Sequence, residues 1–195
     1  MLNSGIFKAL AGVVALLTFL GSSISSLGGD DEADNIPTRY GLAASVGNTF
    51  DPDDDITFFQ ISGFIMWDYD KVWRHWAPQS LRFKVEATAG LATSPRLRGM
   101  GSIDMMALYY LESISNHRFN PYIEGGIGVI YTGFKVDGQG SRLNFNPQAG
   151  IGMEFRPDTG PPYFGALRLS HVSNAGLYED NRGVNSVVLM IGRYF

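Results

Sequence analysis

The sequence predicts an all-β fold: an eight-stranded antiparallel transmembrane β-barrel of the outer-membrane type with a filled polar interior. Three observations predict it. Apolar and polar residues alternate with a period of two in eight segments, each close to the roughly 9–11 residues that a tilted membrane-spanning strand needs. Aromatic residues stand near the ends of these segments, as in the aromatic girdles of membrane barrels. An apolar stretch near the N-terminus has the organisation of a secretory signal peptide.

The composition excludes several other classes of protein. The chain has 195 residues, of which 45% are hydrophobic and 17% are charged, with a formal net charge of −4 and no Cys. Without Cys there is neither a disulfide framework nor a thiol nucleophile. The acidic balance argues against binding to nucleic acid, which calls for a basic surface. The apolar content is too high for a largely disordered chain.

The first residues are predicted to be a targeting segment. Lys8 precedes an apolar run from Ala9 to Leu20, which is followed by a stretch of small residues. The run is too short to cross a hydrocarbon core of about 30 Å as a helix. We therefore predict a signal peptide at residues 1–26, with an approximate cleavage site, and a single barrel domain at residues 27–195. An uncleaved amphipathic anchor is the alternative.

The alternation is clearest in residues 81–91 and 143–155. From Leu81 to Leu91 every odd position is a large apolar residue or Ala, and the even positions include Arg82, Lys84 and Glu86. The same test predicts six further strands, at Arg39–Gly47, Ile56–Tyr69, Gly101–Glu112, Tyr122–Phe134, Tyr163–Ser173 and Val184–Phe195. Eight is an even number, as expected of bacterial membrane barrels.

The two faces of these strands decide between a membrane barrel and a water-soluble one. The polar faces carry balanced charges: Arg39, Arg82, Lys84, Arg156 and Arg168 against Glu86, Asp104, Glu112, Glu124 and Glu154. The apolar faces end in aromatic residues: Trp67, Tyr69, Tyr109, Tyr131 and Phe195. The run from Leu189 to Phe195 is similar to the C-terminal assembly signal of bacterial outer-membrane proteins. We therefore predict localisation in the bacterial outer membrane, with a barrel too narrow for a general diffusion pore.

The most specific feature of the chain lies at the end of the predicted seventh strand. His171 and Ser173 are two residues apart, so they share one face of the strand. That face also holds Leu167 and Leu169, which places the imidazole and the hydroxyl on the lipid side. Polar groups in lipid are costly without a partner or a task. A Ser nucleophile needs a base within hydrogen-bond reach, and a neighbouring His can supply one.

Asn185 is the predicted third member of this group. It shares the outward parity of Val187 and Leu189 on the last strand, and a hairpin turning about Tyr178 would set it beside His171. Because both termini of such barrels face the periplasm, this end of the hairpin is predicted to be extracellular. A polar cluster wetted by interfacial water, without catalysis, is the alternative.

The segment His-x-Ser-Asn-Ala-Gly at the end of the seventh strand of a small barrel resembles the lipid A 3-O-deacylase family (PagL-like outer-membrane deacylases). In that family the Ser is the nucleophile, the His is its general base, and a Glu across the hairpin orients the His. The resemblance implies these roles for Ser173 and His171. The orienting position falls on Asn185, which is not a carboxylate, and the loop carboxylates of Glu179 and Asp180 are the alternatives.

The resemblance implies ester hydrolysis through an acyl-enzyme, with lipid A or lipopolysaccharide of the outer leaflet as substrate. Asn174 and Gly176 are the residues expected to bind the oxyanion or the substrate. No cofactor, metal or nucleic acid is expected. Outer-membrane lipids are the surrounding partners, and the sequence leaves a homodimer open. Two other functions compete: a non-catalytic barrel serving structure, adhesion or hydrophobic-ligand passage, and an esterase acting on phospholipids.

The other two histidines and the acidic loop are interpreted without a catalytic or metal-binding role. His75, in a turn beside two Trp residues, is expected to anchor the chain at the membrane interface, and His117 is expected to be an exposed turn residue. An acidic external loop could attract Ca²⁺ or Mg²⁺, but it lacks the Gly and terminal Glu of an EF-hand and is interpreted as solvated. Its members are Asp51, Asp53, Asp54 and Asp55.

Overall fold

The computed structural model describes residues 39–52, 56–93 and 96–195. The predicted signal peptide, the start of the barrel domain at residue 27, and Asp53, Asp54 and Asp55 of the acidic loop lie outside the described residues, so the division at residues 26 and 27 stays a prediction. Within the described ranges no helix has both the length and the apolar character needed to cross a membrane.

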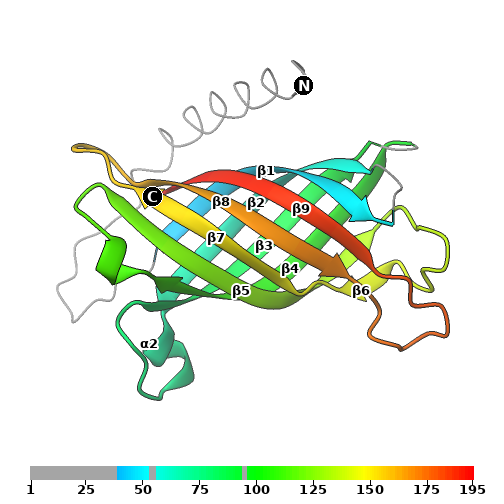
Figure 1. Cartoon of the computed structure of the whole chain (residues 1–195), viewed down its shortest axis with the longest axis horizontal. Helices are drawn as coiled ribbons and strands as arrows, with labels where there is room; N and C mark the ends of the chain where they lie inside the picture. The colour runs from blue at the N-terminus through cyan, green and yellow to red at the C-terminus, as the bar shows by residue number, and fades with distance from the viewer. Residues whose placement is uncertain (1–38, 53–55, 94–95) are drawn as a thin grey trace.

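The described residues form one antiparallel sheet that closes on itself (Figure 1). Its strands are β1 (Arg39–Asp51), β2 (Thr57–Asp68), β3 (Leu81–Ala92), β4 (Arg98–Tyr110), β5 (Phe119–Thr132), β6 (Leu143–Phe145), β7 (Gln148–Phe155), β8 (Tyr163–Val172) and β9 (Val184–Tyr194). Two short helical turns, α2 (Tyr69–Trp73) and η1 (Glu112–Ile114), lie between strands. Neighbouring strands follow the order β4-β3-β2-β1-β9-β8-β7-β5-β6, and β4 also pairs with β5, which completes the barrel.

β6 and β7 together make one strand of the barrel, interrupted at Pro147. Val129 of β5 pairs with Phe145, and Gly126 pairs with Gln148, so the register runs on across the break. Proline has no backbone N–H and cannot donate to the ladder, which accounts for the interruption. The barrel therefore has eight strands, and the predicted fold class is confirmed.

Some predicted strand ends were wrong by a few residues. β1 continues past Gly47 to Asp51, β4 and β5 each begin three residues earlier than predicted, and Tyr69 starts α2 instead of ending a strand. Glu112 lies in η1, not on a strand face. Near the rim of a barrel the backbone can stay paired after the alternation of side chains has faded, and alternation can continue after pairing has ended, so parity alone misplaces strand ends in both directions.

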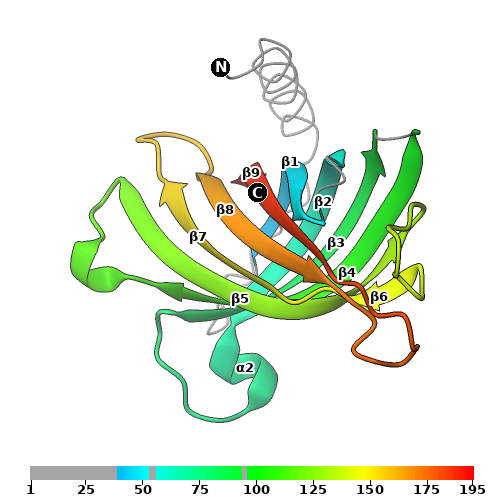
Figure 2. The same cartoon turned by 45° about the vertical axis from the view of Figure 1, so that its right-hand side comes forward.

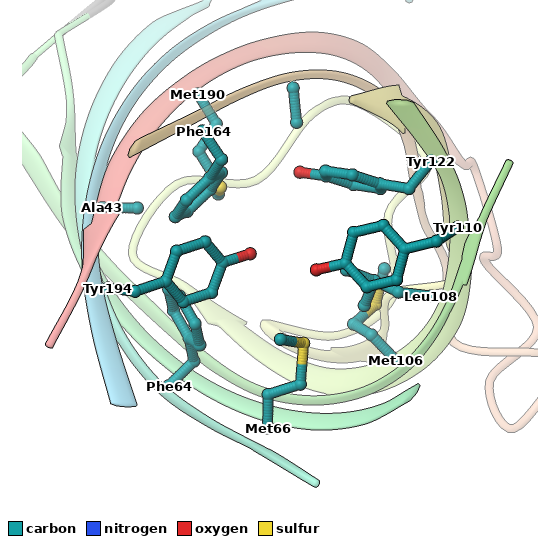
Figure 3. Close-up of a cluster of buried hydrophobic side chains, with 11 residues drawn as sticks. Ala43, Phe64, Met66, Met106, Leu108, Tyr110, Tyr122, Phe164, Met190 and Tyr194 are labelled. Atoms are coloured by element: carbon teal, nitrogen blue, oxygen red, sulfur yellow. The ribbon is translucent and has the colours of Figure 1, made fainter. Parts of the chain in front are cut away.

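The interior is filled by three layers of side chains. At the end of the barrel near Tyr194, three tyrosine hydroxyls point inward from a ring of buried apolar side chains (Figure 3). Toward the opposite end lies a second apolar layer of buried side chains, made of Ile56, Phe58, Ala92, Met100, Ile130, Phe134, Val136, Val172, Val184 and Val188. We call this second end the loop end, because it carries the loop between β8 and β9.

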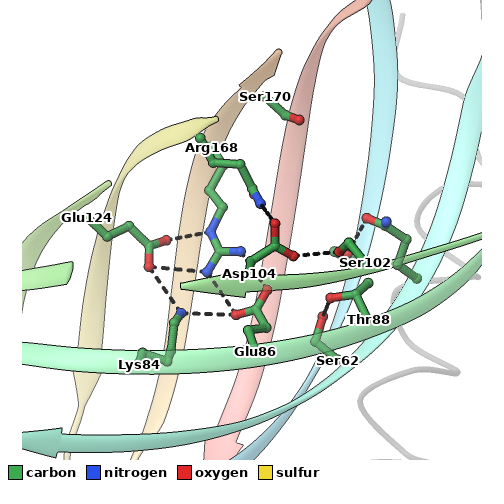
Figure 4. Close-up of polar contacts among 12 residues, drawn as sticks. Ser62, Lys84, Glu86, Thr88, Ser102, Asp104, Glu124, Arg168 and Ser170 are labelled. Carbon is green, nitrogen blue, oxygen red and sulfur yellow. Dashed lines mark hydrogen bonds and ion pairs between the residues drawn. The ribbon is translucent and has the colours of Figure 1, made fainter. Parts of the chain in front are cut away.

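A charged layer lies between the two apolar layers (Figure 4). Arg168 bridges Glu86 and Glu124, with Nη1 2.7 Å from Glu86 Oε1 and Nε 2.6 Å from Glu124 Oε1. Lys84 Nζ lies 3.0 Å from Glu86 and 3.2 Å from Glu124. Two positive and two negative side chains thus neutralise one another, and the predicted polar, plugged interior is confirmed.

The outer surface is apolar, as predicted. Exposed side chains around the barrel wall include Tyr40, Ile61, Ile103, Tyr109, Ile123, Tyr131, Ile151, Leu167, Leu169 and Leu189. The loop end gathers segments that are distant in sequence. The tip of β1, the loop between β5 and β6, and the loop between β8 and β9 all project there, away from α2 (Figures 1 and 2). The candidate site lies at this end.

Candidate active site

His171 lies at the loop end of β8 and points outward. Its neighbours Ser170 and Val172 are buried in the lumen, whereas His171 is exposed. His171 and Asn185 are directly opposite in the β8–β9 ladder, and His171 Nδ1 lies 2.6 Å from Asn185 Oδ1. The structure therefore brings together two of the residues that the sequence singled out, on the lipid-facing wall.

The backbone around Ser173 and His171 is held by the neighbouring strand. The His171 N–H donates to the carbonyl of Pro147 (3.0 Å), and Ser173 exchanges two backbone hydrogen bonds with Phe145 (3.1 and 2.8 Å). Ser173 thus stays in extended backbone one residue beyond the end of β8, so that it shares the outward face with His171. In the described part of the chain no hydrogen bond joins the Ser173 hydroxyl to His171. Such contacts between a nucleophile and its base often form only when substrate is bound.

Gly183 leaves the space that the imidazole occupies. A Cβ atom at this position would lie 2.5 Å from His171 Cε1 and 3.2 Å from Nε2. Gly183 immediately precedes Val184, the ladder partner of Val172, so continuing the register by one residue sets it across from Ser173. The ring of His171 therefore leans from its own position toward that of Ser173.

The predicted oxyanion residues shape a tight turn. Leu177 N–H donates to the Asn174 carbonyl, and Ala175 and Gly176 both have positive φ, at 54° and 80°. These are the features of a type I′ turn, which is strained for Ala. Asn174 is buried; its Oδ1 accepts from Gly176 N–H (2.9 Å) and its Nδ2 donates to the Asp180 carbonyl (2.7 Å). Both predicted donors are thus engaged inside the loop.

A second loop braces this turn. Gly140 N–H donates to the Asp180 carbonyl, and Arg182 N–H donates to the Gly138 carbonyl, both at 2.8 Å. The side chains of Glu179 and Asp180 are exposed, and within the described residues neither carboxylate hydrogen-bonds to His171. Among the described residues, the side-chain hydrogen bond to His171 comes from Asn185.

Asp51 joins the group, and sequence reasoning missed it. Its Oδ2 accepts a hydrogen bond from Asn185 Nδ2 (2.8 Å), and its Oδ1 lies 2.7 Å from Arg182 Nη2. The expectation that Asp51 belongs to a loop is wrong, because Asp51 is the last residue of β1, although its side chain is half exposed. Barrel closure could have indicated this contact, because it makes the first strand a neighbour of the last.

The other histidines lie apart from this group. His75 follows α2, with its ring centroid 5.7 Å from that of Tyr69 and its Nδ1 3.1 Å from the Trp76 carbonyl. His117 lies in the turn before β5 and is exposed. Among the described residues no three His, Asp or Glu side chains are arranged to hold a metal ion.

A closed eight-stranded barrel with an apolar outer belt defines a class: a small outer-membrane β-barrel. This one carries a polar group of Ser173, His171 and Asn185 on its lipid-facing wall. The family model for lipid A 3-O-deacylase (PagL) matches residues 41–194. The chain belongs to this family. It is accordingly a carboxylic ester hydrolase of the outer membrane.

Individual relatives agree with this assignment. The chain is 31% identical over 131 residues to lipid A deacylase PagL of Pseudomonas aeruginosa, an alignment that covers 64% of this chain and 72% of the relative. The crystal structure of the outer-membrane enzyme PagL superposes with a TM-score of 0.58 at 28% identity, covering 78% of this chain and 97% of that one. Neisserial surface protein A, with a TM-score of 0.61 at 14% identity, covers 80% of this chain and 94% of its own, and shares the fold alone.

Proposed function

We propose that this protein hydrolyses the ester that links the 3-hydroxyacyl chain to position 3 of lipid A in the outer leaflet. The family assignment supports lipid A as the substrate. The observation that carries the mechanism is the hydrogen bond between His171 Nδ1 and Asn185 Oδ1 on the lipid-facing wall. Ser173 is the proposed nucleophile, His171 its general base and Asn185 the residue that orients the base.

The hydrogen bond assigns the protons of the imidazole. An amide oxygen only accepts, so His171 must carry a proton on Nδ1, which leaves Nε2 with a free lone pair. The space above Gly183 tilts the ring so that this nitrogen faces the Ser173 position. Nε2 is then the atom that takes the Ser173 proton.

The reaction proceeds in two steps. Ser173 Oγ attacks the ester carbonyl as its proton passes to His171 Nε2, and collapse of the tetrahedral intermediate returns that proton to the departing 3-hydroxyl of the glucosamine. Water then attacks the acyl-enzyme with His171 again as base. The products are the free 3-hydroxy fatty acid, the 3-O-deacylated lipid A and the regenerated Ser173.

Asn174 and Gly176 remain our proposed oxyanion or substrate-binding residues. Because their amide groups bond to each other and to the Asp180 carbonyl, we propose that their contribution is to hold the strained turn after Ser173 in shape. A donor from this turn becomes available to substrate only if one of these internal bonds is exchanged. Strain stored beside a site is consistent with such a rearrangement.

The outward direction of the site suits a lipid substrate. The ester of a membrane lipid is already at the barrel wall, at the depth of the strand ends, so the lipid need not leave the leaflet. The lumen is largely occupied by the charged and apolar layers of buried side chains, whereas His171 and Asn185 lie on the outer wall that the lipid contacts. No bound group is required by the two steps.

The test is mass spectrometry of lipid A from cells that express the wild type or Ser173→Ala. We expect the wild type to remove one 3-hydroxyacyl mass and Ser173→Ala to remove none, because the remaining oxyanion and binding contributions cannot replace the nucleophile. Ser186→Ala is the matched control. Ser186 lies next to Asn185 at the loop end of β9 but is buried in the lumen, so activity should persist.

Two results would contradict the proposal. Release of fatty acid from phospholipid, with lipid A intact, would favour the phospholipid esterase. An unchanged lipid A mass from a folded wild-type barrel would favour the non-catalytic barrel. Heat-modifiable migration in gel electrophoresis establishes folding in each case.

A further inference from the structure

We infer that Asp51 is a positioning residue for the hydrolytic site, supplying through Asn185 the negative charge that Asn185 itself lacks. This inference rests on the proposed function. The chain of contacts runs from His171 Nδ1 to Asn185 Oδ1 (2.6 Å) and from Asn185 Nδ2 to Asp51 Oδ2 (2.8 Å). It joins three strands that are adjacent only because the barrel closes: β8, β9 and β1.

A β-bulge directs Asp51 to this position. From Gly41 to Thr49 the β1–β9 ladder is regular, and its continuation would set Phe50 opposite Asn185. The register shifts between Thr49 and Asp51, so Asp51 takes the place opposite Asn185 instead. Such bulges redirect side chains and are frequent beside active sites. Without the extra residue, an apolar ring would occupy the position of the carboxylate.

Asp51 determines which way the Asn185 amide faces. An ionised carboxylate has acceptors but no donor, so it must meet the NH₂ group of the amide. The carbonyl oxygen of the same amide then faces His171, which in turn must carry its proton on Nδ1. The reverse amide orientation would set an oxygen against the carboxylate. Asp51 therefore selects the imidazole tautomer that leaves Nε2 free.

The carboxylate also stabilises the charge that forms during catalysis. When His171 takes the Ser173 proton it becomes an imidazolium, and a fixed anion nearby lowers the energy of that state. Asn185 is a polarisable link between the two charges, because hydrogen bonds in a chain strengthen one another. The ion pair to Arg182 does not account for this arrangement, since it uses the other oxygen of Asp51 and both side chains are about half exposed (49% and 50%).

The experiment measures kcat and KM for release of 3-hydroxy fatty acid by the purified full-length barrel. Asp51→Asn keeps the size of the side chain and an acceptor for Asn185 but removes the charge. We expect kcat to fall by about tenfold, the equivalent of losing one hydrogen bond to a charged group, with KM little changed. Asp158→Asn is the matched control, because Asp158 is also a carboxylate paired with an arginine, Arg118, whose side chain is about half exposed, but in the turn between β7 and β8.

A second background separates positioning from mere structural support. Asn185→Glu introduces a carboxylate that contacts His171 directly, and it then faces the like charge of Asp51. In this background Asp51→Asn should raise kcat, because the substitution removes the repulsion between the two carboxylates. The charge of Asp51 is no longer needed there, since Glu at position 185 supplies one directly. A structural role for Asp51 would predict the same loss in both backgrounds. The reversal of sign is therefore the decisive result.

A third measurement does not require lipid A. A fluorophosphonate probe labels an activated serine as Oγ attacks phosphorus, fluoride leaves and the base accepts the proton. We expect labelling of Ser173 to slow in Asp51→Asn by the same factor as kcat.

The outcomes of this measurement separate the inference from the proposed function. If the wild type is labelled but leaves lipid A intact, the proposed substrate is wrong, and the labelling rates still decide the role of Asp51. Equal rates for the wild type and Asp51→Asn, in folded barrels, would overturn the inference alone. A wild type that neither hydrolyses lipid A nor reacts with the probe would overturn both.

Discussion

Two polar clusters in this barrel differ in their burial and in how many partners each side chain has. In the lumen, Lys84, Glu86, Glu124 and Arg168 are almost fully buried, and each contacts two partners of opposite charge. On the outer wall at the loop end, His171, Asn185 and Asp51 form a single row with one hydrogen bond between successive members. The lumen cluster has balanced charge. The outer row ends at His171, and among the described residues no hydrogen bond joins His171 to the Ser173 hydroxyl.

The difference shows how one strand serves two purposes. β8 contributes Arg168 to the lumen and His171 to the wall, because successive side chains point to opposite faces. A buried ion pair tolerates no missing partner, so the charges of the lumen cluster must balance. In the outer row, no side chain of the described residues hydrogen-bonds to His171 Nε2, and a base requires such an unoccupied nitrogen. We therefore expect changes in the lumen to alter stability and changes on the wall to alter activity.

The largest effect is expected from Arg168→Met, which breaks the lumen cluster. Removing the guanidinium leaves two buried carboxylates with Lys84 as their only cation in that cluster, and breaking a buried pair costs about 3–5 kcal/mol of unfolding free energy. Denaturant unfolding of the refolded barrel in lipid vesicles measures it. Arg118→Gln is the control, since its pair with Asp158 is exposed and should contribute less than about 1 kcal/mol. Comparable losses in the two variants would remove the distinction between the clusters.

Asn185→Ala should give the largest effect on the outer wall after loss of Ser173 or His171. It removes the contact to His171 and disconnects Asp51, so kcat should fall by about 10- to 100-fold while the unfolding free energy changes by less than about 1 kcal/mol. Asn185→Glu should keep or raise activity. Fatty-acid release per folded molecule is the measurement, and an unchanged rate in Asn185→Ala would remove Asn185 from the site.

A smaller effect is expected from Gly183→Ala, which changes no hydrogen-bonding group. The new methyl would lie 2.5 Å from His171 Cε1, so the ring must move away from its present position. We expect a several-fold loss of kcat, up to about tenfold. Gly165→Ala is the matched control, because Gly165 also lies on the outer wall of β8 and an added Cβ there meets only the Met190 carbonyl at 3.8 Å. Equal activities of the two variants would mean that the tilt of the imidazole does not matter.

The parity of side chains is predictable because it depends only on the neighbouring backbone. A period of two is enough to assign Arg168 to the lumen and His171 to the wall. The pairing of His171 with Asn185 follows as well, since a hairpin sets its own register from the length of its loop. The inward direction of Asn174 was not predicted, because the alternation ends where the type I′ turn begins.

By itself, the sequence determined the barrel, the two faces of its strands, and the His171, Ser173 and Asn185 group, because all of these follow from local alternation and one hairpin. Only the tertiary structure decided that Asp51 lies behind Asn185. That contact joins residues 134 positions apart and needs both closure of the barrel through β1 and β9 and a one-residue bulge. The alternation of side chains shows neither the closure nor the bulge. Closure is a property of the whole sheet, and a bulge reverses the parity on which the prediction relies.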